Sequence, residues 1–345
     1  NGEGDHPYSQ LDGNDLLPEV VLGRISVRTS TELATVINKI ISYEQAYNME
    51  DAWYERAGLV GDPSTSGIST VITSQNIAEK MINYGMEDVR LKISGGSYDN
   101  WMVNELSNGV GYLNYRGYYG VSGFNSSDVD AANNGYKLPF ATIITCGTGS
   151  FASESQCLSE KFIRAGSTTT PKGAVACVGT ATIGTHTLFN NAVNLGIYQG
   201  IFVNNFQTTG EALVAGKLNL YQNYPSNPSN WVKIFTYWTN LMGDSATPLW
   251  TGNPIVMNVE HQNSINAGQN FMSANITAND SPIKNALVTL VDSDINGFYK
   301  QGFTDENGNV TLNFEPNEIT ENIEITVTKF GHKPYMNSLN FINEQ

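Results

Sequence analysis

The clearest chemistry in this sequence lies at a cysteine that ends an apolar run. Cys146 sits in ITCGTGSF, residues 144–151, where a strand pattern gives way to a glycine-rich turn. A thiol becomes a nucleophile when a neighbouring base or cation favours its thiolate. A second turn of this kind, LNYRGYYG at residues 113–120, places Tyr118 and Tyr119 where such a base is expected. Tyrosine, with a pKa near ~10, is neutral at pH 7 and cannot be that base.

The sequence contains four histidines that could substitute for the missing base. His6 lies in a polar N-terminal segment that we predict to be mobile, and His261 and His332 lie in the C-terminal region. His186 follows the apolar run GAVACV and is the one candidate for a base that approaches Cys146. Two interpretations stay open: Cys146 is a small buried side chain, or it is a nucleophile paired with His186.

Two tyrosines and several acids have simpler interpretations. We interpret Tyr118 and Tyr119 as rings that fill a vacated cleft, since tyrosine buries much apolar area. Alternating oxygen-bearing side chains in the segment 305–309 could hold a structural calcium ion, but a turn explains them equally well. Asp128 and Asp130 are predicted to be solvated loop acids.

Alternating strands and helices must position the cysteine. Apolar runs predict strands at residues 19–27, 88–93, 110–114, 140–145 and 173–178. Periodicity and capping residues predict helices at residues 31–47, 74–84, 100–108 and 153–165. This order predicts an open, mostly parallel sheet with helices on both faces, and catalytic groups at the carboxyl ends of its strands.

The two longest predicted helices each show an apolar face. Ser30 or Thr31 is expected to cap the first, and Ser74 the second. The residues expected to face inward are Ala34, Ile37, Ile40 and Ile41 in the first helix and Ile77, Met81 and Ile82 in the second.

The pattern changes near residue 250. From Ile255 onward, short alternating runs replace helical periodicity, and the Asn-Gly pair at 307–308 predicts a hairpin. We therefore predict an α/β domain at residues 1–254 and an immunoglobulin-like β-sandwich at residues 255–345.

Composition excludes several functions. The net charge is −15 and no Lys/Arg cluster is present, which argues against nucleic acid as a partner. No stretch approaches the ~20 apolar residues of a membrane span. Three cysteines, an odd number, do not form a disulfide framework, and their spacing does not resemble a zinc site. A low charged fraction of 15% and a start at asparagine favour a processed, secreted protein.

Several motifs in this order resemble those of the gingipain family of caspase-like cysteine peptidases. LNYRGYYG resembles the turn that carries the family's histidine, and ITCGTGSF the segment that carries its nucleophile. Residues 8–33 and 235–250 resemble two further family segments. The resemblance implies a caspase-like α/β sandwich that corresponds to the second, catalytic subdomain, followed by the family's immunoglobulin-like domain.

The departures from the family pattern concern the catalytic groups. The resemblance places Cys146 at the nucleophile and Tyr118 at the histidine. The third group, a carboxylate, falls near residues 59–61, beside Asp62. The acid for basic-residue specificity falls near Thr70 or Val71, where no carboxylate stands.

We therefore expect a secreted gingipain-like protein that has lost peptidase activity. It is expected to serve as a self-assembling structural or binding component, such as a filament or surface layer. Its expected partners are copies of itself, as a homo-oligomer or homopolymer, or its own detached N-terminal fragment, and no cofactor is required. The alternatives are an active cysteine endopeptidase that uses Cys146 with His186 or another base, and a fragment that works only with its missing subdomain.

Overall fold

The computed structural model describes residues 2–152, 155–292, 298–315 and 323–342. The chain divides into unit 1, Asn1–Asn253, and unit 2, Pro254–Gln345. Each unit has its own hydrophobic core.

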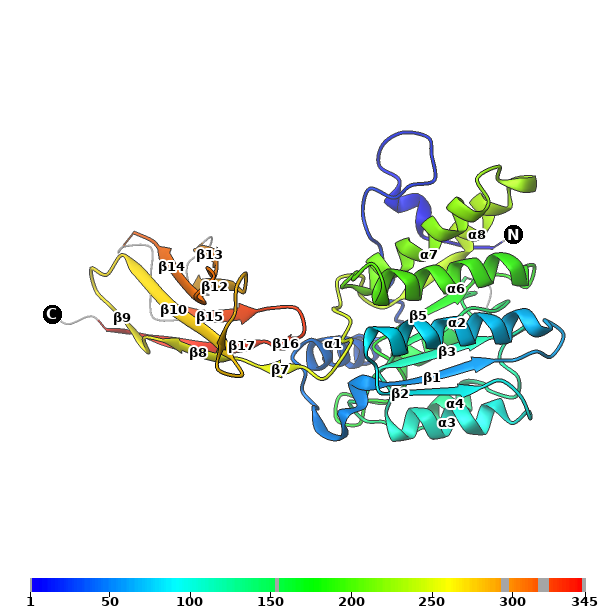
Figure 1. Ribbon diagram of the computed structural model, residues 1–345, viewed down its shortest axis with the longest axis horizontal. Helices are drawn as coiled ribbons and strands as arrows, with labels where there is room; N and C mark the ends of the chain where they lie inside the picture. Colours follow the sequence, from blue (N-terminus) through cyan, green and yellow to red (C-terminus); the bar gives the residue numbers. More distant parts are fainter. Residues whose placement is uncertain (1, 153–154, 293–297, 316–322, 343–345) are drawn as a thin grey trace. The chain divides into compact units, whose positions relative to one another are not determined.

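Unit 1 is built on a six-stranded sheet in the order β2-β1-β3-β4-β5-β6 (Figure 1). The first five strands in sequence run parallel, and β6 pairs antiparallel with β5. The strands are β1 Arg56–Gly61, β2 Asp88–Lys92, β3 Tyr112–Arg116, β4 Phe140–Ile143, β5 Ala176–Thr180 and β6 Thr239–Met242. The predicted mostly parallel sheet is confirmed.

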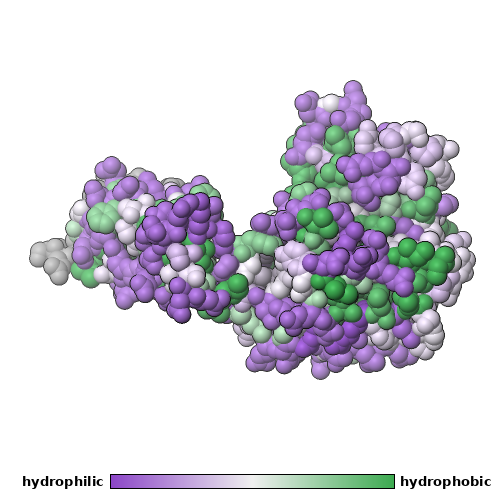
Figure 2. Space-filling model, in the orientation of Figure 1, coloured by the Kyte–Doolittle hydropathy of each residue, from purple (hydrophilic) through white to green (hydrophobic). Residues whose placement is uncertain are grey.

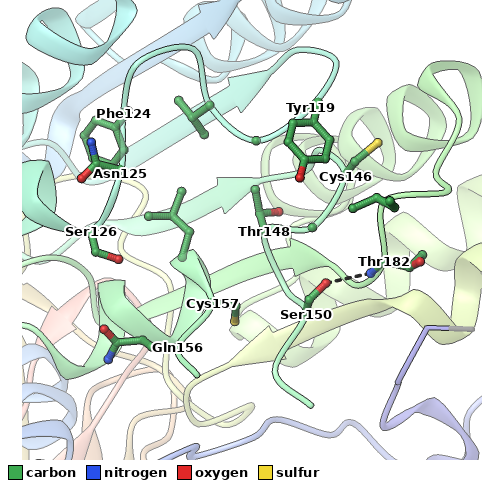
Figure 3. Close-up of a pocket in the computed structure, with 15 residues that line it drawn as sticks. Tyr119, Phe124, Asn125, Ser126, Cys146, Thr148, Ser150, Gln156, Cys157 and Thr182 are labelled. Carbon is green, nitrogen blue, oxygen red and sulfur yellow. Dashed lines mark hydrogen bonds between the residues drawn. The ribbon is translucent and has the colours of Figure 1, made fainter. Parts of the chain in front are cut away.

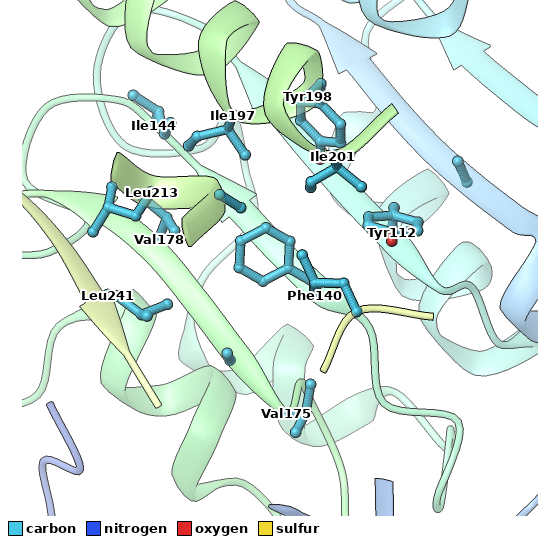
Figure 4. Close-up of a cluster of buried hydrophobic side chains, with 14 of the residues drawn as sticks. Tyr112, Phe140, Ile144, Val175, Val178, Ile197, Tyr198, Ile201, Leu213 and Leu241 are labelled. Carbon is cyan, nitrogen blue, oxygen red and sulfur yellow. The ribbon is translucent and has the colours of Figure 1, made fainter. Parts of the chain in front are cut away.

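Helices cover both faces of this sheet, as predicted. Alternate side chains of each central strand enter different cores: Phe140 of β4 packs on one face, and Ala141 on the other. Figure 4 shows Phe140 and Tyr112 of the first core beside Ile197 and Tyr198. The helices are α1 Ser30–Glu44, α2 Ile68–Tyr84, α3 Tyr98–Asn108, α4 Ser126–Ala131, α5 Leu158–Arg164, α6 Thr187–Phe202, α7 Thr209–Asn223 and α8 Trp231–Trp238.

The sheet of unit 1 lies between two layers of helices, with one hydrophobic core on each face. Residues of α2, α6 and α7 pack in the first core, and residues of α3, α4 and α5 pack in the second. In Figure 1, α2 and α6 lie side by side over one face. The sheet is therefore enclosed on both faces, which suits its parallel strands.

Segment 19–27 corrects the first strand prediction. Only Arg24 pairs there, in an isolated bridge to Met242, while Val20, Val21 and Ile25 are exposed. The apolar run lacks the alternation that would bury one face, so it passes along the end of the sheet as a loop.

The capping predictions for α1 and α2 are also wrong. Thr29 caps α1, because its hydroxyl accepts the Glu32 N–H at 3.1 Å. Helix α2 begins at Ile68, after Gly67 with φ +71°, and Ser74 lies inside it, donating to the Val60 carbonyl at 2.9 Å.

The buried faces of these helices differ from the predicted ones as well. In α1, Ile40 is buried as predicted, but Ala34, Ile37 and Ile41 are exposed. In α2, Ile77 and Met81 are buried, and Ile82 is exposed. The predicted helix at 153–165 begins at Leu158, and residues 153 and 154 lie outside the described residues.

The N-terminal segment is packed rather than mobile. His6 is buried, its Nε2 lies 2.9 Å from the Leu16 carbonyl, and its Nδ1 lies 3.2 Å from Nζ of Lys217. Asp5 pairs with Arg24, and its N–H donates to Asn240 at 3.0 Å. These contacts bind the first residues to the domain, so the prediction that this segment is mobile is wrong.

This segment makes the stability of unit 1 depend on pH. Burial, and then the charge of Lys217, lower the pKa of His6 from 6.5 to about 4. Between pH 6.5 and pH 4, His6 is protonated in the unfolded chain but neutral in the folded chain. The free energy of unfolding therefore decreases as the pH falls from 6.5 to 4. We expect a loss of about 2–3 kcal/mol from this group. His6→Gln should show a smaller decrease in melting temperature between pH 7 and pH 4.5 than the unchanged chain. Equal decreases would contradict this expectation.

Unit 2 is all β in its described residues. A five-stranded sheet, β13-β12-β15-β17-β9, and a four-stranded sheet of β11, β10, β14 and β8 share one core. Strands β7 and β16 form a small separate pair. The strands are β7 Ile255–Val256, β8 Asn258–His261, β9 Ser264–Asn266, β10 Phe271–Ala278, β11 Ser281–Pro282, β12 Leu287–Asp292, β13 Tyr299–Phe303, β14 Asn309–Asn313, β15 Ile323–Thr328, β16 His332–Lys333 and β17 Tyr335–Ile342.

The turn at 305–309 is not the predicted hairpin. It joins β13 and β14, which belong to different sheets. The Asp305 carboxylate accepts the N–H groups of Asn307 and Asn309, each at 2.9 Å, and Gly308 adopts φ +77°. The Asn-Gly pair therefore makes a tight turn that crosses between the sheets.

Candidate functional site

The carboxyl ends of the parallel strands bring the predicted site segments together. The Gly120 N–H, in the loop after β3, donates to the Cys146 carbonyl at 3.2 Å. The Gly147 N–H, after β4, donates to the Thr182 carbonyl at 2.8 Å. Tyr119 and Cys146 form an isolated parallel bridge. Three loops thus meet around Cys146.

The Cys146 sulfur lies against a threonine. Its Sγ is 2.8 Å from Oγ1 of Thr185, and the side chain is 6% exposed. The Thr185 hydroxyl also accepts the Asn190 amide N–H at 3.0 Å, and either the thiol or this hydroxyl can donate in the contact with the sulfur. A threonine hydroxyl cannot remove a proton from a thiol at neutral pH, so Thr185 is not a general base for Cys146.

His186 is the residue next to Thr185, and it caps a helix. Its Nδ1 accepts the Leu188 N–H of α6 at 3.1 Å, and its ring lies 5.5 Å from that of Phe189. The Nδ1 atom of His186 is therefore already occupied by a hydrogen bond from the backbone. The contact with the sulfur is made by Thr185, one residue earlier.

Tyr118 and Tyr119 do not fill a vacated cleft. They are 53% and 63% exposed, and an open pocket of about 640 Å³ lies beside Tyr119. Tyr119 lines this pocket. The interpretation of the rings as a plug is therefore wrong, because the loop directs them toward solvent. The role of Tyr118 at the histidine position stays a prediction.

The pocket opens between the loops that follow β3, β4 and β5. Figure 3 shows Tyr119 and Cys146 at one end of it and Gln156 at the other. Phe124 and Cys157 also line it.

All three cysteines are free, and burial raises the pKa of the Cys157 and Cys177 thiols, for Cys157 to about 12. These two thiols are therefore poor nucleophiles at neutral pH.

Sequence reasoning missed Arg116, the last residue of β3. Its buried guanidinium donates to the Asn191 amide oxygen through Nε at 2.9 Å and Nη2 at 2.6 Å. It also donates to the carbonyls of Ile144 and Thr187. Burial lowers the pKa of Arg116 to about 9, so the side chain remains protonated at pH 7. One cation thereby links β3, the cysteine loop and the start of α6.

Asp62 is the second residue that sequence reasoning left without a role. It follows β1 and is buried. Its carboxylate accepts the hydroxyls of Tyr115, at 2.8 Å, and Ser122, and the Ser64 N–H at 2.9 Å. Burial by itself would raise the pKa of Asp62, but these hydrogen bonds outweigh it and lower the pKa. The carboxylate therefore secures the loop after β3.

The described residues offer no cluster of three or more His, Cys, Asp or Glu side chains that could hold a metal ion. Asp128 and Asp130 lie in helix α4 and not in a loop as predicted: Asp130 pairs with Lys161 at 2.6 Å, and the Asp128 carboxylate accepts the N–H of the N-cap residue Asn125 at 2.7 Å. The structural calcium ion considered for the segment 305–309 stays a prediction.

Comparison with known proteins places this geometry in a family. The model of peptidase family C25 matches residues 3–250. This chain belongs to peptidase family C25. The relatives of this C25 chain include gingipain R2 of Porphyromonas gingivalis, which is 29% identical over 186 residues. That match covers 51% of this chain and 25% of the relative. Lys-gingipain of the same organism is 23% identical over 368 residues, covering 96% of this chain and 20% of the relative.

A solved structure shows the same fold. The crystal structure of the Arg specific cysteine proteinase gingipain R aligns with a TM-score of 0.86 and 22% identity. The alignment covers 98% of this chain and 79% of that one. The predicted gingipain resemblance and the fold, a caspase-like α/β sandwich followed by an immunoglobulin-like domain, are confirmed.

Two further facts bound what the family tells us. The C25 chain spans about a quarter or less of the length of the curated relatives it matches. In the part of the chain that the structure describes, no helix is both long enough and apolar enough to cross a membrane.

Proposed function

We propose that this C25-family chain is a secreted protein without peptidase activity, whose loops around Cys146 bind a peptide without cleaving it. The contact that carries the proposal is the one between the Cys146 sulfur and the Thr185 hydroxyl. Cysteine peptidases need a base within hydrogen-bond reach of the thiol, and here the neighbour is a threonine hydroxyl, which is not a base at neutral pH. The tyrosine at position 118 and the capping role of His186 support the same conclusion.

A covalent probe tests the state of the thiol. Peptidyl acyloxymethyl ketones, with a mixture of residues before the reactive group, alkylate cysteines that attack as activated nucleophiles. We expect no adduct on Cys146 by intact-protein mass spectrometry after hours at pH 7.5. Iodoacetamide in denaturant should label the same cysteine and so show that it is reduced. A stoichiometric ketone adduct that Cys146→Ala abolishes would refute the proposal.

A second candidate is an active cysteine endopeptidase that uses Cys146 with His186. The observation in its favour is that His186 directly follows Thr185, whose hydroxyl contacts the sulfur. A change of rotamer would have to break the His186 cap on Leu188. This candidate predicts a ketone adduct that His186→Ala abolishes, whereas the first proposal predicts none in either protein.

Self-association into an oligomer or polymer is the second part of the proposed function. Figure 2 shows hydrophobic patches over α2, where Ile68, Ile72 and Ile82 are exposed. The edge strand β2 is protected by charged residues, so association through that edge is disfavoured. Apolar side chains on a helix surface are a better support for contact with another copy.

We expect multi-angle light scattering to give a mass above that of one chain at micromolar concentration. Replacing Ile72 and Ile82 together by aspartate should lower this mass, because charges would enter the apolar contact. Leu11→Asp, on an exposed residue of the N-terminal loop, serves as the control. A monomeric unchanged chain would contradict self-association, and a complex with a co-purifying N-terminal fragment would replace it.

A further inference from the structure

The pocket beside Cys146 has an uncharged lining. Among the lining residues that the structure describes, none is Asp, Glu, Lys, Arg or His. Apolar and aromatic side chains make up much of its wall, including Tyr119, Val121, Phe124 and Ile183. Amides and hydroxyls supply the rest, among them Asn125 and Gln156. A charged group that entered this pocket would lose water without gaining a counter-charge.

The two helices that begin at the pocket do not supply that counter-charge. Asn125 precedes α4, and its N–H already donates to the Asp128 carboxylate at 2.7 Å. Cys157 precedes α5, and its N–H donates to Glu160 at 2.9 Å. Both helix starts therefore have their positive ends satisfied from within the chain, which disfavours an anionic ligand.

The acid of α5 is neutralised as well. Glu160 pairs with Arg164 at 2.6 Å, and both side chains are buried. Its carboxylate is thus unavailable to a basic ligand. The size of the pocket, about 640 Å³, falls in the range of sites that hold small molecules or large side chains.

We propose that this pocket selects a large uncharged side chain, aromatic or aliphatic, of a bound peptide, and rejects arginine and glutamate. The proposal rests on the proposed function only in taking the ligand to be a peptide. The exposed ring of Tyr119 offers a face for an aromatic or aliphatic group. Gln156 offers an amide to the peptide backbone.

Binding of matched peptides to the full chain tests this selection. The probes are fluorescein-labelled acetyl-Gly-Ser-X-Ser-Gly amides with X as Phe, Leu, Arg or Glu, measured by fluorescence anisotropy. The Phe and Leu peptides should bind about tenfold or more tightly than the Arg and Glu peptides. Tightest binding of the Arg or Glu peptide, equal binding of all four, or no binding of any would overturn the proposal.

A single isosteric charge should change the selection. Gln156→Glu places a carboxylate on the pocket wall with little change of shape, and should strengthen binding of the Arg peptide about tenfold. Gln75→Glu is the matched control, on an exposed residue of α2 outside the pocket lining. If both variants strengthen binding of the Arg peptide equally, or if neither variant does, this pocket is not the site of selection. Mass spectrometry of the same peptides reads cleavage separately, so peptidase activity would refute the proposed function without deciding the selection.

Discussion

A histidine placed at position 118 is expected to give this chain peptide cleavage that depends on Cys146. The loop with Tyr118 lies beside the cysteine, since the Gly120 N–H donates to the Cys146 carbonyl at 3.2 Å. A positioned general base contributes roughly 10²–10⁴-fold to such reactions. The Cys146 sulfur would still contact Thr185 in this variant. We therefore expect the cleavage rate of Tyr118→His to rise by about 10²-fold over the background of the unchanged chain, the lower end of this range. Release of fluorescent products from a mixed peptide library measures this gain.

Two matched variants make that experiment specific. Tyr118→His with Cys146→Ala should return to background, which would show that the gained activity uses the thiol. Tyr119→His places the same imidazole one residue along, on the residue that lines the pocket, and should give no gain. A gain in Tyr119→His alone would show that the family's histidine position is Tyr119 and that our alignment is wrong.

Removal of the Arg116 side chain is expected to produce the largest loss of stability among the site residues. Its guanidinium satisfies two buried acceptors, the Asn191 amide oxygen and the Ile144 carbonyl, and the half-buried carbonyl of Thr187. Each acceptor left unsatisfied costs about 1–3 kcal/mol, so Arg116→Ala should lower the free energy of unfolding by about 3–5 kcal/mol. Urea unfolding followed by circular dichroism measures this quantity.

The control for Arg116 is an arginine without buried partners. Arg28→Ala removes an exposed side chain and should change the free energy of unfolding by less than about 0.5 kcal/mol. Similar losses in the two variants would mean that the links from Arg116 to the cysteine loop and to α6 add little stability.

The sequence predicted the central strands β3, β4 and β5 and also the charged edge strand β2. Strands β3, β4 and β5 are buried at every position and are mostly apolar, although β3 also buries Asn114 and Arg116. Strand β1 was missed because Gly58 and Gly61 interrupt its short run, although both approach neighbouring elements closely. Segment 19–27 has the apolar content of a strand, but only Arg24 forms a bridge to a strand, at Met242. Whether a segment pairs as a strand depends on the strands beside it in the fold, and these lie far away in the sequence.

The position of Cys146 at the end of a strand could be predicted, and its partner could not. A strand that ends before a glycine-rich turn places the next side chain at the edge of the sheet, where Cys146 lies. The partner Thr185 comes from the loop after β5, and tertiary packing brings it to the sulfur. Arg116 escaped notice because a buried arginine inside an apolar run has no sequence signature. The uncharged pocket also combines residues of three loops.

Cleavage of a diverse peptide mixture, read by mass spectrometry, tests most directly whether Cys146 has lost its catalytic role. The unchanged chain and Cys146→Ala would each be incubated with the mixture at pH 7.5 under reducing conditions, at equal micromolar concentrations. Because Thr185 and not an imidazole contacts the sulfur, we predict that the two proteins leave identical peptide profiles. New cleavage products that appear with the unchanged chain and are absent with Cys146→Ala would contradict the loss of peptidase activity.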